Sequence, residues 1–201
     1  MKKILFLVAL LFSMTTMAQR LSVLGIKMGT GIDEAERRLS QRFGEYEVYR
    51  TGNVELCCYG KKVGGVNFDH ILFEFQNEQR GREIISYLSS VVLSSHFTSQ
   101  TSAEEFFFYW HDKLWAKYGG VIDNNLRENF GEYYTERGDE PKKEAIVESV
   151  ENGKKNLCAG YGSPGRAIIS TMEYGPSKGG DYFWYVTINF MTSFIDESND
   201  Y

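Results

Sequence analysis

Apolar residues recur at helical spacing in two segments of the chain, which begin 71 residues apart at Thr30 and Thr101. Spacings of three and four residues place side chains on one face of a helix, and a Gly commonly ends it. We therefore expect two amphipathic helices that end at Gly44 and Gly119. Their buried stripes comprise Ile32, Ala35, Leu39 and Phe43 in the first, and Phe107, Trp110, Leu114 and Tyr118 in the second.

Side-chain oxygens near each helix start suggest N-caps. Thr30 and Asp33 stand in capping-box register, with Asp in place of the usual Glu. In the second helix, Thr101 and Ser102 are each followed by a Glu three residues on. We expect Thr30 to cap the first helix, and Thr101 or Ser102 the second.

Each helix is followed by four segments with strand patterns, separated by Gly- and Asn-containing turns. The chain before the first helix, Leu21 to Met28, suggests a short strand or an extended arm. The strand segments after the first helix are 46–50, 54–59, 66–76 and 84–97. Those after the second are 145–150, 156–161, 166–174 and 182–192.

The order of elements therefore occurs twice, and Gly52-x-x-x-Leu56-Cys57 recurs as Gly153-x-x-x-Leu157-Cys158 at matching places. We predict an α+β fold of two tandem helix-plus-four-strand repeats, residues 19–98 and 99–201, with helices on one face of an antiparallel sheet. The second repeat is longer because of a polar insertion at about residues 120–143. We expect this insertion to be disordered or to run over the surface rather than to bind a ligand.

The first 18 residues have the pattern of a secretory signal. Lys2 and Lys3 precede the apolar stretch 4–12, and a plausible cleavage site ends at Ala18. The stretch is shorter than the roughly 20 residues of a membrane-spanning helix. Because no cysteine follows it, lipid has nowhere to attach. We expect a periplasmic or secreted chain that starts at Gln19 and has no membrane span, the alternative being a retained N-terminal anchor.

The charge of the chain bears on its partners. Cleavage removes two of the 22 Lys and Arg residues, leaving 20 against 27 acidic residues, a formal charge of −7. Nucleic acids and anionic membranes reward clusters of Lys and Arg, so neither is an expected partner.

The three cysteines are an odd number for an oxidising compartment. Cys57 and Cys58 are neighbours in a strand pattern and point to opposite faces, which opposes a bridge between them. Cys158 reaches one of them only if the two repeats bring these strands together. We favour buried free thiols, since cysteine among apolar residues usually acts as a small core side chain.

No motif indicates a cofactor or a metal. Residues 160–165 match G-x-G-x-x-G, but a strand pattern follows instead of the required helix, which favours a hairpin turn. His70, His96 and His111 lack the close spacing of metal ligands. A Cys58–His70 pair would supply a thiolate and a base, yet no third group is seen to orient them. We therefore do not expect an enzyme.

The last strand segment divides into two faces. Tyr182, Trp184, Val186, Ile188 and Phe190 form an apolar set for the helix side. The opposite side receives Phe183, Tyr185, Thr187 and Asn189. Mixed aromatic and polar residues on an uncovered face are typical of recognition surfaces, so these four are the candidate binding residues. A face covered by another layer or a loop explains them equally well.

The segment Gly29-Thr30-x-x-x-Glu34-Ala35-x-x-x-Leu39, preceded by Leu24-Gly25-Ile26, resembles the opening of SmpA/OmlA-type envelope domains. The helix and four strands occurring twice resemble the tandem fold of the β-lactamase inhibitory protein. These resemblances imply a fold and a habit of protein contact across a sheet. The chain departs from both, since it lacks a lipidation cysteine and its cysteines are not paired within each repeat. No residue of β-lactamase inhibition is carried over.

The sequence thus predicts an exported binding module that recognises a protein or an envelope polymer through an uncovered sheet face, without a cofactor. An envelope assembly or scaffold protein is one alternative. A cysteine- or carboxylate-based hydrolase is the other, and it would need convergent polar residues that the sequence does not display.

Overall fold

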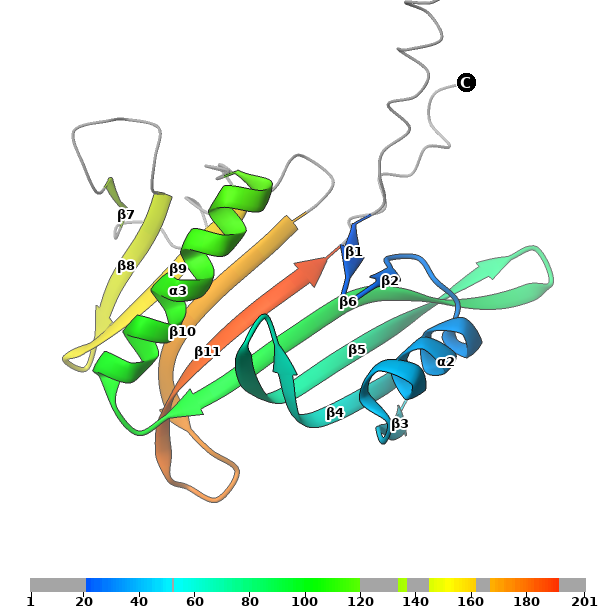
Figure 1. The fold of residues 1–201 in the computed structure, drawn as a ribbon, viewed down its shortest axis with the longest axis horizontal. Helices are drawn as coiled ribbons and strands as arrows, with labels where there is room; N and C mark the ends of the chain where they lie inside the picture. The colour runs from blue at the N-terminus through cyan, green and yellow to red at the C-terminus, as the bar shows by residue number, and fades with distance from the viewer. Residues whose placement is uncertain (1–20, 52, 120–133, 137–144, 162–166, 192–201) are drawn as a thin grey trace, which may run out of the picture.

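The computed structural model describes residues 21–51, 53–119, 134–136, 145–161 and 167–191. They form an α+β fold with a nine-stranded sheet, a two-stranded sheet and two helices (Figure 1). The predicted signal segment 1–18, with its alternative as an anchor, lies outside these residues. So do residues 162–165 of the glycine motif and most of the predicted insertion.

The elements match the predicted order closely. In chain order they are β1 (Ser22–Val23), β2 (Ile26–Lys27), α2 (Ile32–Phe43), β3 (Glu47–Thr51), β4 (Asn53–Val63), β5 (Val66–Arg80), β6 (Glu83–Phe97), α3 (Gln100–Tyr118), β7 (Tyr134–Glu136), β8 (Ala145–Glu151), β9 (Lys154–Tyr161), β10 (Ala167–Pro176) and β11 (Tyr182–Met191).

The large sheet has the strand order β3-β4-β5-β6-β11-β10-β9-β8-β7, and every neighbouring pair is antiparallel. The strands that follow α2 make one half of the sheet, and those that follow α3 make the other. The last strand of each set, β6 and β11, meet in the middle, paired from Trp184 and Phe97 to Met191 and Ser90.

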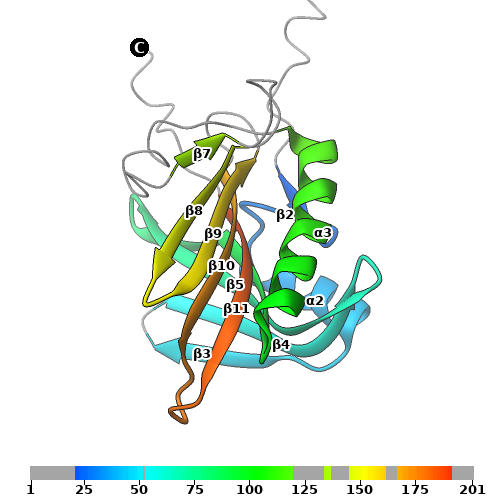
Figure 2. The ribbon, with the colours of Figure 1, turned by 90° about the vertical axis from the view of Figure 1, so that its left-hand side faces the viewer.

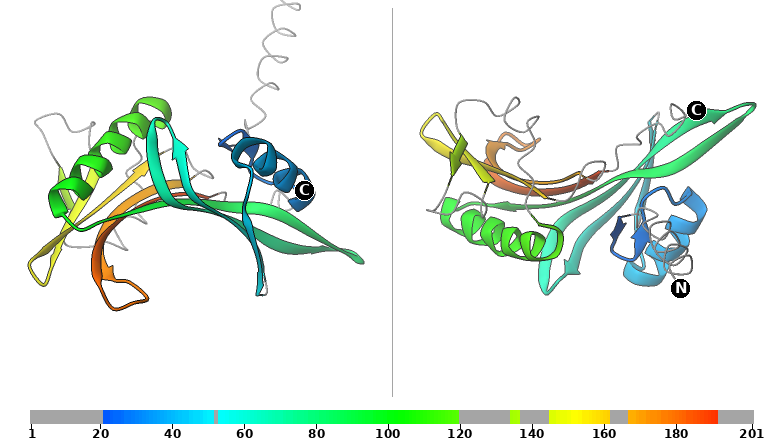
Figure 3. Two further views of the ribbon diagram at one scale, coloured as in Figure 1. Left: turned by 60° about the horizontal axis from the view of Figure 1, so that its bottom comes forward. Right: turned by 90° about the horizontal axis from the view of Figure 1, so that it is seen from above.

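Both helices lie on the same side of the sheet (Figure 3). Helix α2 packs on β4 and β6, and α3 packs on β6, β9, β10 and β11 (Figure 2). The core lies between the helices and the sheet, because the apolar stripe of each helix must be buried. Leu39 of α2 and Phe107 and Leu114 of α3 are buried there, while Ile32, Phe43 and Tyr118 pack against its margin.

The predicted N-caps are wrong, although both glycine stops are confirmed. Helix α2 starts after Gly31 and α3 after Ser99, and neither N-cap residue makes a side-chain hydrogen bond to its helix. Thr30 instead contacts β6, where its carbonyl accepts a hydrogen bond of 2.9 Å from the Leu88 amide. Gly44 and Gly119 end the helices with φ angles of 75° and 72°, which suit glycine.

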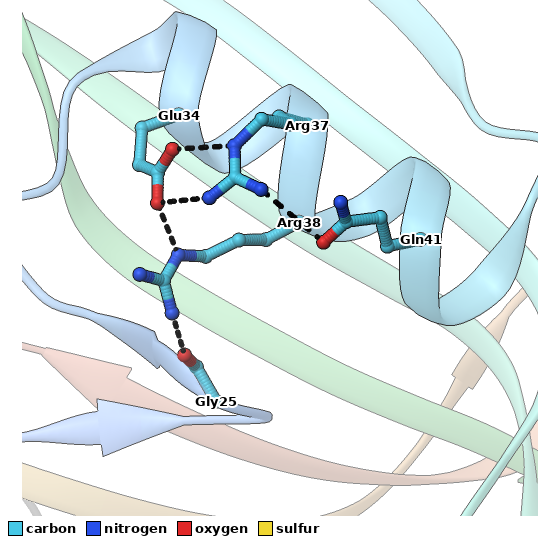
Figure 4. A network of polar contacts seen from close by, with 5 residues as sticks. All are labelled: Gly25, Glu34, Arg37, Arg38 and Gln41. Carbon is cyan, nitrogen blue, oxygen red and sulfur yellow. Dashed lines mark hydrogen bonds and ion pairs between the residues drawn. The ribbon is translucent and has the colours of Figure 1, made fainter.

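The segment predicted as a short strand or arm forms the small β1–β2 hairpin. A turn at Leu24 and Gly25, both with positive φ, reverses the chain there. Helix α2 holds this turn in place (Figure 4). Arg38 donates to the Gly25 carbonyl at 2.9 Å, and Glu34 accepts hydrogen bonds from both Arg38 and Arg37.

Part of the predicted polar insertion belongs to the sheet. Residues 134–136 pair with β8, Tyr134 opposite Val147, and form the edge strand β7. For these three residues the prediction of disorder or a surface excursion is wrong, because they pair with β8 along one edge. Residues 120–133 and 137–143 lie outside the described part of the chain.

Candidate functional site: the sheet face opposite the helices

The outer face is defined here as the side of the large sheet that carries no helix (Figure 3). It includes the four predicted binding residues, because they alternate along β11 with residues buried in the core. Along β11, burial alternates: Trp184, Val186, Ile188 and Phe190 are buried in the core, whereas Phe183, Tyr185, Thr187 and Asn189 are partly exposed. The predicted division into two faces is therefore correct, except that Tyr182 is not buried on the helix side. That side chain is 58 % exposed and stacks on Tyr174 next to the β10–β11 turn.

Strand register maps the outer face into rows that cross the sheet. The row through Thr187 is, in order, Tyr59, His70, Ser94, Thr187, Thr171 and Cys158. The row through Asn189 is Glu47, Cys57, Leu72, Val92, Asn189 and Ile169. The row beside it is Tyr49, Glu55, Glu74, Ser90 and Met191.

Phe183 and Tyr185 join an aromatic and charged cluster that includes two residues of the first half of the chain. Their rings meet edge to face, with 6.4 Å between centroids. His96 lies opposite Tyr185 in register, and its ring packs against Phe183. Asp69 contacts the His96 Nδ1 at 2.8 Å and accepts a hydrogen bond from the His96 backbone amide at the same distance.

The sequence did not single out Asp69 or pair it with His96, because they lie 27 residues apart on two strands. Alternation along 84–97 places Ser94 and His96 on one face, which was the only sequence pattern that could have pointed to His96 as a surface residue. Matching them to Phe183 and Tyr185 required the β6–β11 register, which no local pattern specifies.

The two other predicted binding residues form the polar centre of the face. Thr187 lies between Ser94 and Thr171, and Asn189 lies between Val92 and Ile169. Ser90 donates a hydrogen bond of 2.9 Å to the side-chain oxygen of Asn189. The structure thus places all four predicted residues on one surface. The hydrogen bond from Ser90 on the neighbouring strand fixes the side chain of Asn189.

His70 stacks on Tyr59 with 5.1 Å between ring centroids, and its Nε2 is shielded from solvent without a hydrogen-bond partner in the described part of the chain. Burial lowers the pKa of His70. The negative charge of Glu55 opposes this effect, whereas the positive charge of Lys178 adds to it. The imagined Cys58–His70 pair is ruled out. Cys58 lies in the core on the helix side, opposite Ile71, whereas His70 faces the other way.

Several carboxylates lie on the outer face. Glu55 and Glu74 are direct cross-strand neighbours, and Glu173 lies opposite Tyr185. The ion pairs of the described residues do not involve any of these three. Like charges directly opposite each other on a sheet are destabilising, so the Glu55–Glu74 pair has an unfavourable electrostatic energy.

All three cysteines are buried and unbridged, as favoured from the sequence. Cys57 and Cys158 both lie on the outer-face rows, but β4 and β9 are five strand positions apart, roughly 24 Å at the usual strand spacing. A disulfide needs Cα atoms within about 7 Å. Burial raises the pKa of Cys57 to about 11 and that of Cys158 to about 12, and it also raises the pKa of Cys58, so none is a ready nucleophile at neutral pH.

A buried polar network on the helix side was not foreseen. The Tyr161 hydroxyl lies 2.8 Å from both the His111 Nδ1 and the Ser170 hydroxyl, and all three residues are at most 2 % exposed. Burial raises the pKa of Tyr161. Because solvent does not reach these groups, they join α3 to β9 and β10 rather than offer a reactive site.

Within the described residues, His, Cys, Asp and Glu side chains do not gather in any group of three or more suited to a metal ion. The helices described are too short or too polar for any of them to cross a membrane. The chain matches no protein-family model, no curated protein and no solved structure.

Proposed function

We propose that this protein is an exported binding module that recognises a protein or an envelope polymer through the outer face of its sheet. The observation that carries the proposal is the partly exposed cluster of Phe183, Tyr185 and His96 on the side opposite both helices. Aromatic side chains give large contact areas at little entropic cost, and they dominate binding energy at protein interfaces. Export rests on the N-terminal sequence pattern.

Binding accounts for this face better than catalysis. Its best candidate for acid–base chemistry is the Asp69–His96 pair, in which each side chain is 50 % exposed. In the described part of the chain, the His96 ring makes no hydrogen bond to a hydroxyl or thiol that it could activate. A hydrolase needs a nucleophile and a base within hydrogen-bond reach, and the raised pKa values of the cysteines oppose that role.

A duplication of one helix-plus-four-strand unit is our proposed origin for this surface. Two observations support this origin. The strand order is mirrored about the β6–β11 pair, and each helix packs on strands of its own half, although α3 also packs on β6. Joining two such units at their last strands yields a sheet wide enough to expose an extended face while its other side is covered. Such a face suits contact with another macromolecule more than with a small ligand, which favours a concave pocket.

The test is capture of partners from a bacterial envelope fraction by residues 19–201, compared with two single variants. Tyr185→Ala removes an outer-face ring, and Tyr182→Ala removes an exposed ring of the same type and strand on the other side. The proposal predicts that Tyr185→Ala loses a captured component that Tyr182→Ala retains. Identical capture by all three proteins would refute it.

A further inference from the structure

We propose that the partner of the outer face is a cationic protein segment, and that the facing carboxylates of Glu55 and Glu74 receive one of its Arg or Lys side chains. The inference rests on the proposed function, because it specifies the partner of the same face. The proposed occupant is a basic and extended stretch of another protein.

The charge of the face supports a basic partner. Five carboxylates belong to its rows or lie at their ends. The five are Glu47, Glu55, Asp69, Glu74 and Glu173. Lys178 in the β10–β11 turn is a basic group whose charge acts on His70. Charge complementarity across an interface directs binding and excludes partners of the wrong sign.

The Glu55–Glu74 pair is the centre of the proposed site. Side chains directly opposite each other on antiparallel strands have Cβ atoms about 5 Å apart, so one guanidinium or ammonium group can contact both carboxylates. Both side chains are only partly exposed, which reduces the screening of their repulsion by water. A cation placed between them would remove that repulsion and add hydrogen bonds.

Tyr49 stands beside this pair, and Tyr59 lies two rows away on the same face. Tyr49 is the register partner of Glu55 on β3, and its hydroxyl lies 3.3 Å from that of Tyr59, which is 49 % exposed. Arg side chains stack on aromatic faces while their nitrogens bind carboxylates, so tyrosines beside an acidic pair favour Arg over Lys. Burial lowers the pKa of His70, which disfavours a competing positive charge on this face.

Other occupants fit less well. Nucleic acid and anionic lipid would meet carboxylates rather than Lys and Arg. A second copy joined face to face by two-fold symmetry would bring two acidic surfaces together. A partner with Arg or Lys on an extended segment meets neither objection.

The probe is a random 12-residue peptide library displayed on phage and selected against residues 19–201. Selected peptides are then synthesised, together with versions in which Gln replaces every Arg and Lys. The proposal predicts an excess of basic residues, binding that weakens as salt rises, and loss of binding in the Gln versions. The double variant Glu55→Gln/Glu74→Gln should bind about tenfold more weakly.

Glu36→Gln/Glu105→Gln is the matched control, since it removes two carboxylates from helices α2 and α3. It should bind within about twofold of the unmodified protein, because these charges lie on the other side of the sheet. Thermal melting checks that both double variants fold. The outer-face variant should melt no lower than the parent, since it loses a repulsion.

Different experimental outcomes would overturn the cationic partner and the binding surface itself. Neutral or acidic peptides whose binding is lost in Tyr185→Ala would overturn the cationic partner and leave the face as a binding surface. Peptides indifferent to both Tyr185→Ala and Glu55→Gln/Glu74→Gln, or no selected peptide at all, would count against both. A dimer in solution that either outer-face variant dissociates would replace the cationic segment by a second copy.

Discussion

The ring of Phe183 packs edge to face against the imidazole of His96, with 5.0 Å between the two centroids. This contact joins the last strand of the chain to the last strand before α3. Asp69 fixes the His96 side chain from β5, so three strands contribute to one cluster on the outer face. The aromatic surface is therefore a product of the central β6–β11 pairing rather than of one strand alone.

We expect Phe183→Ala and Tyr185→Ala to change folding stability far less than Trp184→Ala, which lies between them in sequence. Trp184 is 3 % exposed in the core, and its truncation should cost about 3–5 kcal/mol, whereas partly exposed rings leave no sealed cavity. Urea unfolding of the three variants measures the difference. A comparably large loss for both Phe183→Ala and Tyr185→Ala would mean that this face is covered, and would remove the main support for binding.

Leu114→Ala and Leu39→Ala should each destabilise the protein by about 2–5 kcal/mol. Both side chains fill the core under their helices, with Leu114 4 % and Leu39 0 % exposed. Chemical denaturation monitored by circular dichroism provides the values. As a control, Lys113→Ala alters an exposed position of α3 next to Leu114 and should change little. A loss below about 1 kcal/mol in both leucine variants would contradict the placement of the core.

Most of the elements of this fold could be predicted from the sequence, because periodicity reflects burial directly. Period-two alternation in 182–191 identified the two faces of β11, and glycines 44 and 119 identified the ends of the helices. The prediction that Thr30 caps α2 failed, since its carbonyl pairs with the amide of Leu88, which is 58 residues away. Pairings of this kind depend on tertiary structure and override local propensity.

The candidate site was predicted only in part, because local alternation identifies a face of one strand but not the register between strands. The four residues of β11 followed from alternation along one strand. The Glu55–Glu74 and His96–Phe183 contacts depend on register between strands, which is set by the packing of the whole sheet. Tyr182 was expected to be buried but is exposed, because alternation continues past the point where the core ends.

The thiols should be fully reduced and slow to react in the folded protein. At pH 8, with the pKa of Cys57 near 11 and that of Cys158 near 12, only about one thiol in a thousand or fewer is ionised. Alkylation in denaturant without reductant, read by mass spectrometry, should block three cysteines, and alkylation of the native protein should block almost none. One blocked thiol in the denatured sample would reveal a disulfide.

Acid should weaken the attachment of α2 to the β1–β2 turn. Hydrogen bonds from Arg37 and Arg38 lower the pKa of Glu34 from 4.5 to about 2. A carboxylate with a lowered folded-state pKa contributes its stability above the unfolded value, and loses that contribution as the pH falls from 4.5 to about 2. Glu34→Gln should therefore melt lower than the parent at pH 7 and alike near pH 2. The interaction is exposed, so the difference should be small and should shrink in salt.

The Glu55–Glu74 pair should oppose folding while it serves binding. Glu74→Gln removes the repulsion and should raise the free energy of unfolding by roughly 0.2–1 kcal/mol. Glu74→Lys should raise it at least as much, because Lys then faces Glu55 as an opposite charge on the neighbouring strand. Urea unfolding at low salt measures both effects, and added salt should reduce them.

The same Glu74→Lys variant should lose affinity for basic peptides more than Glu74→Gln does, because it places a positive charge where the partner's cation is expected to bind. A gain in stability together with a loss of binding separates a functional charge from a structural one, since a structural role would move both in the same direction. If Glu74→Lys destabilises the fold, the two carboxylates do not repel each other as their register requires. If it binds basic peptides as well as the parent does, the cation lies elsewhere on the outer face or does not bind it at all.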